Sequence, residues 1–122
     1  MHIQHKDRVA TPFLAPFGER IYELVGRTEG GGGTPRHSLA HVHAPPGARS
    51  PRHYHRVLEE TYYVLEGEAR VLHGERMVTL RPGEALLIPP GTVHQLFNEG
   101  TAPLEMLVVC APAWSADDSF EA

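Results

Sequence analysis

Short apolar runs follow one another along the chain, separated by polar turns that are rich in glycine and proline. The strongest strand signal is Glu60-Thr61-Tyr62-Tyr63-Val64-Leu65, because β-branched and aromatic residues favour a pleated sheet. No window shows a convincing helical period. The pattern predicts an all-β fold, with short strands over residues 20–25, 38–43, 60–65, 69–72, 77–80, 85–88, 93–97 and 104–109.

The segments outside these strands differ in character. Residues 1–18 contain two prolines and no strong period, so they predict an extended N-terminal arm with one edge strand. Residues 30–33 are four consecutive glycines, which no regular element would hold, and they predict a mobile loop. Residues 73–76 include Gly74 and indicate a hairpin turn. Residues 111–122 lack a strand pattern, so we expect a C-terminal tail that packs through Trp114.

So many short strands in a chain of 122 residues favour a closed architecture. A chain of this length fits one domain with a modest core and leaves no room for a second. It could not bury both faces of a large open sheet, whereas closure removes the free sheet edges and encloses one interior. We therefore expect a single antiparallel barrel or jelly roll over residues 1–122.

Composition and charge exclude several classes of partner. Lys and Arg total 11 against 15 Asp and Glu, which gives a formal charge of −4. This charge does not indicate the basic surface that binding to nucleic acid requires. No apolar run approaches the roughly 18 residues of a membrane span, and the first residues lack the apolar segment of a signal peptide. The single cysteine, Cys110, cannot form an internal disulfide. We therefore expect a cytoplasmic protein with neither nucleic acid nor membrane as a partner.

Nine histidines are present, and three of them suggest a metal site. His53 and His55 lie two residues apart, so on an extended strand both would point to the same face. Glu60 begins the next strand, and His94 follows a Pro-Pro-Gly turn. If all four side chains enter a barrel lumen, they form a set of three nitrogens and one oxygen that suits a divalent transition metal. The alternative for the histidine pair alone is a solvated polar strand.

Two spaced motifs extend this constellation. Gly47, His53, His55, Glu60 and Gly67 stand at spacings that resemble the first signature of the cupin superfamily over residues 47–67. Gly83, Pro89, Gly91, His94 and Asn98 resemble the second over residues 83–98. Neither motif departs from the family pattern, and the short link between them resembles that of small single-domain members. The resemblance implies the cupin fold, a double-stranded β-helix or jelly-roll barrel.

The resemblance also implies one divalent metal held by His53, His55, Glu60 and His94. A mixed shell of imidazole and carboxylate with open positions favours Fe(II) or Mn(II), while Zn, Ni and Cu stay open. A metal-dependent enzyme acting on a small molecule is the leading interpretation, with oxygenation as the favoured reaction. The alternatives are a sugar or sugar-acid isomerase or epimerase, and a cupin that binds a sugar or another small ligand without catalysis.

Strand alternation assigns roles to further residues. Tyr62 shares the inward face of Glu60 and is a candidate to hydrogen-bond a substrate, although core packing is the commoner role of such an aromatic residue. Tyr63 and Leu65 would face outward and predict a homodimer, because exposed apolar patches usually mark an interface.

The remaining polar residues are expected to play structural or solvated roles. We place His41 and His43 on a strand surface, because no third ligand with suitable spacing accompanies them. Asn98 is expected to act as a turn or hydrogen-bonding residue and Cys110 as a small buried hydrophobe. The cations Arg49, Arg52 and Arg56 could orient an anionic substrate, but solvated loop charge is the favoured interpretation.

Overall fold

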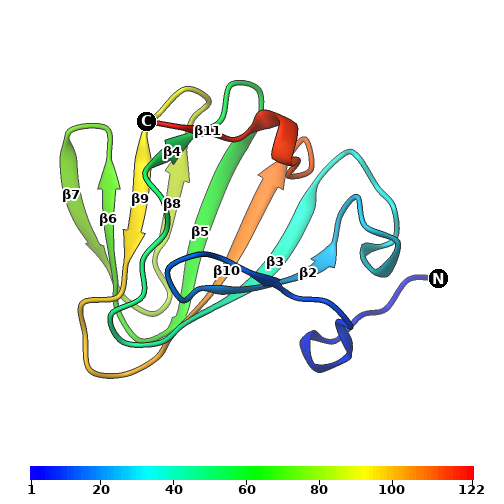
Figure 1. The fold of residues 1–122 in the computed structure, drawn as a ribbon, viewed down its shortest axis with the longest axis horizontal. Helices are drawn as coiled ribbons and strands as arrows, with labels where there is room; N and C mark the ends of the chain where they lie inside the picture. The colour runs from blue at the N-terminus through cyan, green and yellow to red at the C-terminus, as the bar shows by residue number, and fades with distance from the viewer.

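Two antiparallel sheets face each other in the computed structural model, which describes residues 1–122 (Figure 1). The larger sheet has the strand order β1-β2-β3-β10-β5-β8, and its strands are β1 (Phe13–Leu14), β2 (Arg20–Val25), β3 (Ser38–Ala44), β5 (Glu59–Glu66), β8 (Ala85–Ile88) and β10 (Leu104–Ala111). The smaller has the order β11-β4-β9-β6-β7, with β4 (His53–Tyr54), β6 (Ala69–His73), β7 (Arg76–Leu80), β9 (His94–Phe97) and β11 (Phe120–Glu121).

The all-β prediction is confirmed. Each predicted apolar run forms a strand, with bounds that differ from the expected ones by at most two residues at either end. The only helical segments are three short 3-10 turns, η1 (Lys6–Arg8), η2 (Glu29–Gly31) and η3 (Ala116–Asp118). No helix in the structure has the length and apolar character needed to cross a membrane.

Residue alternation along β5 builds the interior between the sheets. Glu60, Tyr62 and Val64 are buried, whereas Tyr63 and Leu65 point outward and stay more than one-third exposed. β10 pairs with β5 and buries Leu104, Met106 and Cys110 on the same side, while β6 and β9 supply apolar side chains from the opposite sheet. These apolar side chains fill the space between the two sheets. Glu60, near the start of β5, is a buried charged residue on the same inner face.

Two glycines illustrate why the turns require this residue. Gly74 has a φ of 63° in the tight connection between β6 and β7, which confirms the predicted hairpin. Gly67 ends β5 with a φ of 82°, and a Cβ atom there would lie 2.5 Å from the carbonyl oxygen of Pro103. A larger residue at position 67 would therefore push the β5–β6 turn away from the chain that leads into β10.

Each end of the chain contains one two-residue strand. The predicted edge strand in the N-terminal arm is β1, which pairs with β2. The expectation of a tail without a strand is wrong: Phe120–Glu121 forms β11 and pairs with β4. A two-residue strand is too short to produce an alternation pattern, which explains the missed element. Trp114 is 40% exposed and packs against the ring of Phe13, with the ring centroids 6.3 Å apart.

Candidate metal centre

The four predicted ligand residues come together at one end of the sandwich, where the two sheets meet. Glu60 stands near the start of β5 in the larger sheet, while His53 on β4 is paired with His94 on β9 in the smaller one. His55 follows directly after β4. The four ligand atoms lie within 4.8 Å of one another. Bonds of about 2.0–2.2 Å from nitrogen or oxygen to a metal place ligand atoms roughly 3–4.4 Å apart, so this set matches a single ion.

All three imidazoles are oriented by the same kind of contact. Nδ1 of His53 donates to the carbonyl oxygen of Pro51 at 2.7 Å, and Nδ1 of His94 donates to that of Thr92 at 2.8 Å. Nδ1 of His55 lies 2.7 Å from its own acceptor, a backbone carbonyl in the C-terminal tail. A carbonyl oxygen only accepts, so each Nδ1 carries the proton and each neutral ring keeps a lone pair on Nε2. This tautomer is the one that a metal ligand bonded through Nε2 requires.

The atoms that face the centre of the cluster have no hydrogen-bond partners. Nε2 of His55, Nε2 of His94 and Oε1 of Glu60 are all buried and unpaired. Oε1 of Glu60 lies 3.0 Å from Nε2 of His94 and 3.6 Å from Nε2 of His55. Buried polar groups without partners are costly, and lone pairs that converge repel one another. A divalent cation between them would satisfy all of these atoms, so the residues present fit a metal.

The electrostatics of the cluster agree with a cation site. Burial tends to raise the pKa of Glu60, but the imidazoles of His55 and His94 that face its carboxylate outweigh this effect and lower that pKa to about 2. Burial, together with the neighbouring His94, lowers the pKa of His53 to about 4. Burial would also lower the pKa of His55, yet its contact with Glu60 prevails and raises it. Glu60 is therefore ionised and His53 neutral at physiological pH, which are the forms that bind metals.

Two residues that sequence reasoning did not assign to the site support its ligands. Sγ of Cys110, on β10, donates to Oε2 of Glu60 at 3.3 Å and leaves Oε1 directed at the histidines. The prediction that Cys110 is buried is confirmed, but its role includes this polar contact. Asp118, in η3, supplies the carbonyl oxygen that accepts from His55. No local pattern signals either contact, because each partner is at least fifty residues distant in sequence.

The segment around His55 is held by further backbone contacts. The carboxylate of Asp118 accepts from the backbone N–H groups of Arg56, Val57 and Leu58, the shortest at 2.8 Å. The N–H of Gly91 donates to the carbonyl oxygen of His55 at 2.6 Å, from a backbone with a φ of 83°. The glycine of the second motif therefore helps to place a ligand of the first, and the tail completes the support from the other side.

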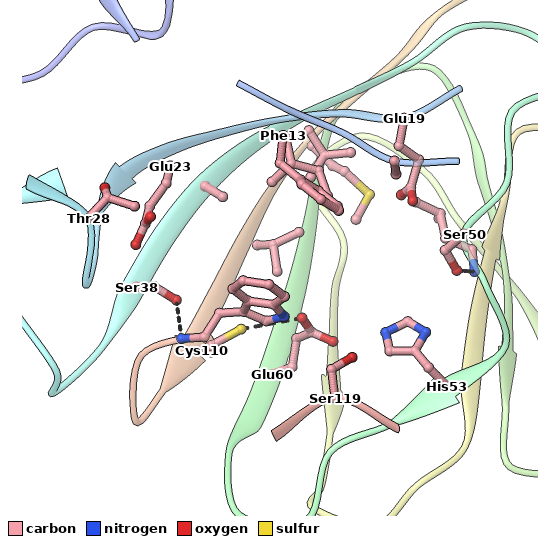
Figure 2. A pocket seen from close by; sticks show the side chains of 18 of the residues that line it. Phe13, Glu19, Glu23, Thr28, Ser38, Ser50, His53, Glu60, Cys110 and Ser119 are labelled. Carbon is pink, nitrogen blue, oxygen red and sulfur yellow. Dashed lines mark hydrogen bonds between the residues drawn. The ribbon is translucent and has the colours of Figure 1, made fainter. Parts of the chain in front are cut away.

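A cavity of about 750 Å³ opens beside the cluster (Figure 2). His53, Glu60 and Tyr62 line it, so the cluster has an accessible side. Residues of the N-terminal arm and of the tail contribute to its walls, and no lysine or arginine does. Much of the lining is apolar and comes from Phe13, Ile21, Val42, Leu96, Met106 and Val108.

Tyr62 points inward as alternation predicted. It is only 4% exposed, belongs to the apolar core and meets the ring of His94 edge to face at a centroid distance of 6.2 Å. Burial raises the pKa of its hydroxyl well above the ordinary value, so Tyr62 stays protonated. It therefore shields one side of the cluster, while its candidacy as a substrate contact stays a prediction.

Asn98 and the second histidine pair lie away from the candidate metal centre. The side chain of Asn98 is buried and donates to the carbonyl oxygens of Ala44 and Ala102, which confirms its hydrogen-bonding role. His41 and His43 lie on the outer side of β3, as expected. Both contact the carboxylate of Glu105 at 2.6 Å, a partner on β10 that the sequence did not reveal.

The predicted loop arginines lie outside the cavity. Arg49 stacks on Phe17 with its guanidinium carbon 4.5 Å from the ring centroid, and Arg56 stacks on Phe120 at 4.1 Å. Together with Arg52, they are exposed and absent from the lining of the 750 Å³ cavity. In this structure they are surface charges and contact neither the metal cluster nor the cavity.

Comparisons with known proteins connect this geometry to a family. A family profile described as "Cupin domain" matches residues 40–110. Uncharacterized protein MJ1618 of Methanocaldococcus jannaschii is 32% identical over 108 residues, which cover 88% of this chain and 85% of that protein. Several further curated relatives are much longer, and the matched regions span only 14% to 18% of their length.

Two solved structures share the architecture. A conserved Klebsiella pneumoniae protein with a double-stranded β-helix domain superposes with a TM-score of 0.73 at 25% identity, covering 92% of this chain and 90% of that one. A sugar phosphate isomerase of the cupin superfamily from Silicibacter pomeroyi gives a TM-score of 0.71 at 26% identity, with 86% and 72% covered. The double-stranded β-helix expected from the sequence is therefore confirmed.

Proposed function

We propose that this chain, which belongs to the cupin family, is a metal-dependent enzyme that oxygenates a small organic molecule with Fe(II) or Mn(II). One observation carries the proposal: three buried, unpaired ligand atoms converge with a fourth ligand residue beside a cavity. Four protein ligands leave positions free on a metal that accepts six, and His53 and Glu60 stand where the cavity reaches the cluster.

The residues of the chain supply binding, orientation and the exclusion of water. His53, His55, Glu60 and His94 would hold the ion, and when bound it would bring substrate and dioxygen together at its open positions. The apolar walls favour an uncharged substrate and dioxygen over bulk water, which limits side reactions. Tyr62, packed against His94, keeps water from the protein side of the cluster.

A sugar or sugar-acid isomerase is the second candidate, and the likeness to the Silicibacter pomeroyi isomerase supports it. The lining of the cavity weighs against a phosphorylated substrate, because no lysine or arginine is present to pair with a phosphate group. Binding of a small ligand without catalysis is the third candidate, and it shares the same cavity.

The test begins with metal and proceeds to turnover. Protein purified without chelator should hold close to one equivalent of a first-row metal per chain. The Fe(II)-loaded protein should bind nitric oxide at an open position, giving the electron paramagnetic resonance signal of a ferrous nitrosyl centre. Oxygen-electrode traces with a panel of uncharged aromatic compounds should then show uptake that depends on Fe(II) or Mn(II).

A matched pair of variants controls this test. His53→Ala should lose both the nitrosyl signal and oxygen uptake, whereas His37→Ala, which removes an exposed histidine far from the cluster in sequence, should keep both. Turnover of a sugar acid without oxygen uptake would replace the oxygenase with the isomerase. Ligand binding without turnover under either metal would favour the non-catalytic candidate.

A further inference from the structure

The charges that line the cavity all have one sign. Glu19, Glu23, Glu60 and Glu121 contribute carboxyl groups, and neither lysine nor arginine contributes a positive charge. Glu60 belongs to the metal cluster, whose ion would neutralise it. The other three face the space that a substrate would occupy. A ligand that carries a phosphate or carboxylate away from the metal would therefore meet repulsion without a compensating cation.

Glu19 is the unusual member of this group. It precedes β2, is only 6% exposed, and its side chain makes no hydrogen bond or ion pair with any other residue. Figure 2 shows its carboxyl group directed into the cavity, on the side where Ser50 and His53 lie. Buried carboxyl groups are ordinarily paired, so an unpaired one that faces a cavity indicates a partner supplied by a ligand.

The environment of Glu19 also limits the chemistry of that partner. Burial, and to a smaller extent the negative charge of Glu60, raises the pKa of Glu19 to about 7. Near neutral pH the group is therefore able both to accept and to donate a hydrogen bond. A hydroxyl group complements either form, whereas an anionic group complements only the protonated one.

The size and polarity of the cavity point to the rest of the ligand. A volume of about 750 Å³ lies within the roughly 300–1,000 Å³ that small organic ligands occupy. Half of the lining residues are hydrophobic, and several of these are aromatic: Phe13, Tyr62, Trp114 and Phe120. Flat apolar walls of this kind favour ring systems over small, strongly hydrated sugars.

We propose that this cavity binds an uncharged, ring-containing molecule, and that Glu19 hydrogen-bonds to one of its hydroxyl groups. The proposal rests on the proposed function in that it defines the substrate class of the same site. It places phosphosugars and small dicarboxylates outside that class. Glu19 is thereby a specificity-determining residue that touches the substrate.

Binding of two probes of nearly equal shape tests the proposal. 2-Naphthol is uncharged at pH 8 and carries a hydroxyl group, whereas 2-naphthoate carries a negative charge. Equilibrium dialysis against the full chain, after treatment with EDTA, should give at least about tenfold tighter binding of 2-naphthol, because a carboxylate in a poorly hydrated cavity repels a second one. Glucose 6-phosphate should bind more weakly than either naphthalene compound.

Two isosteric substitutions locate the selectivity. Glu19→Gln should reduce the preference for 2-naphthol to about threefold or less, because the repulsion of 2-naphthoate and the charge-assisted hydrogen bond are both lost. Glu75→Gln, which alters an exposed carboxyl group between β6 and β7 that does not line the cavity, should leave the preference near its parent value. An equal change in both variants would overturn the assignment to Glu19, as would an unchanged preference in Glu19→Gln.

Separate measurements of turnover with metal and of binding without it distinguish this inference from the proposed function. An absence of oxygen uptake by the Fe(II)- and Mn(II)-loaded protein, with a retained, Glu19-dependent preference for 2-naphthol, would reject the oxygenase and keep the ligand class. Metal-dependent turnover combined with tighter binding of glucose 6-phosphate than of 2-naphthol would reject the ligand class and keep a metal enzyme. Thermal melting of each variant confirms that binding is compared between folded proteins.

Discussion

The backbone carbonyl of Asp118 accepts a 2.7 Å hydrogen bond from Nδ1 of His55. The C-terminal tail therefore orients a candidate metal ligand that lies 63 residues earlier in the chain. The carboxylate of the same residue caps the backbone N–H groups that follow His55. One tail residue thereby fixes both the ring and the loop of this ligand. The tail forms part of the support of the candidate metal centre.

Asp118→Ala should destabilise the protein and weaken metal binding together. The substitution leaves backbone donors of the Arg56–Leu58 segment without an acceptor, which costs about 1–3 kcal/mol in the free energy of unfolding. The loosened tail should also lower metal affinity by about tenfold. Denaturant unfolding and competition with a fluorescent chelator measure the two effects. Asp117→Ala, at an exposed neighbour whose side chain makes no contact of this kind, should change neither.

His55→Ala should abolish most of the metal-dependent thermal stabilisation. Metal at about 100 times its dissociation constant adds roughly 2.7 kcal/mol to a folded protein, which for a chain of this size raises the Tm by on the order of 10 °C. The contact with Glu60 raises the pKa of His55, so protons compete with metal for this ring more strongly than for a free imidazole. The parent should therefore lose this stabilisation as the pH falls from neutral to mildly acidic values.

Melting curves with and without metal across that pH range check this expectation. The core packs without the cluster, so the metal-free His55→Ala protein should still unfold cooperatively. His37→Ala serves as the control and should melt like the parent. An equal metal-dependent increase of the Tm in parent and His55→Ala would place the metal elsewhere.

Glu19→Gln should stabilise the metal-free protein at alkaline pH. The folded-state pKa of Glu19 is about 7, above its ordinary value of 4.5, so the folded state binds the extra proton between these values. Stability from this group is present below pH 4.5 and is lost as the pH rises through 7. The penalty at pH 8 amounts to at most about 3 kcal/mol, from roughly 1.4 kcal/mol per pKa unit.

Urea unfolding of both proteins at pH 5 and pH 8 measures this difference. The glutamine variant should exceed the parent in free energy of unfolding at pH 8 and resemble it at pH 5. The titration of His53 acts in the opposite direction, but it is common to both proteins and cancels in the comparison. A parent that is as stable as the variant at pH 8 would contradict the buried, unpaired state of Glu19.

Cys110→Val should weaken metal binding while the fold is kept. Valine fills a similar volume but cannot donate to Oε2 of Glu60, so the carboxylate loses one of the contacts that orient it. Partners behind metal ligands typically contribute about 10–100-fold in affinity, and the weak S–H donor should lie at the low end of this range. Cys110→Ser restores a donor and should recover most of the affinity. Equal metal affinities in all three proteins would show that the thiol contact has no role in orienting Glu60.

A homodimer through the outer face of the larger sheet is our expectation for the oligomeric state. Tyr63 and Leu65 on β5 share the outer face of the sheet with Leu87 on β8 and Val109 on β10, which both pair with Thr61, and these four apolar residues are at least 38% exposed. Such an apolar face usually marks an interface. Light scattering should give twice the 13.5 kDa mass of the chain. The double variant Tyr63→Asp, Leu65→Asp should be monomeric. The control Val57→Asp, in an exposed loop, should keep the mass of the parent. A monomeric parent would refute the interface.

The pattern of apolar and polar residues within short segments was sufficient to predict the strands of this protein. Alternation along residues 59–66 determined that Glu60, Tyr62 and Val64 share the inner face, because successive side chains of a strand point to opposite sides. The same periodicity, together with the fixed spacing of His53, His55 and His94 to their glycine turns, identified the four candidate ligands. These features depend on residues close together in the chain, so a single sequence displays them.

Only the tertiary structure revealed what surrounds those ligands. The contacts of Asp118 with His55 and of Cys110 with Glu60 join distant segments, and no periodicity connects their positions. Glu19 lies between the N-terminal arm and β2, where no regular pattern signals burial, and only the fold shows that it is buried and lines the cavity. Which residues become neighbours in this way depends on the order of the strands in the sheets and on the path of the irregular segments. The sequence therefore determined which residues can bind a metal, and the fold decided what orients them and what kind of molecule can reach them.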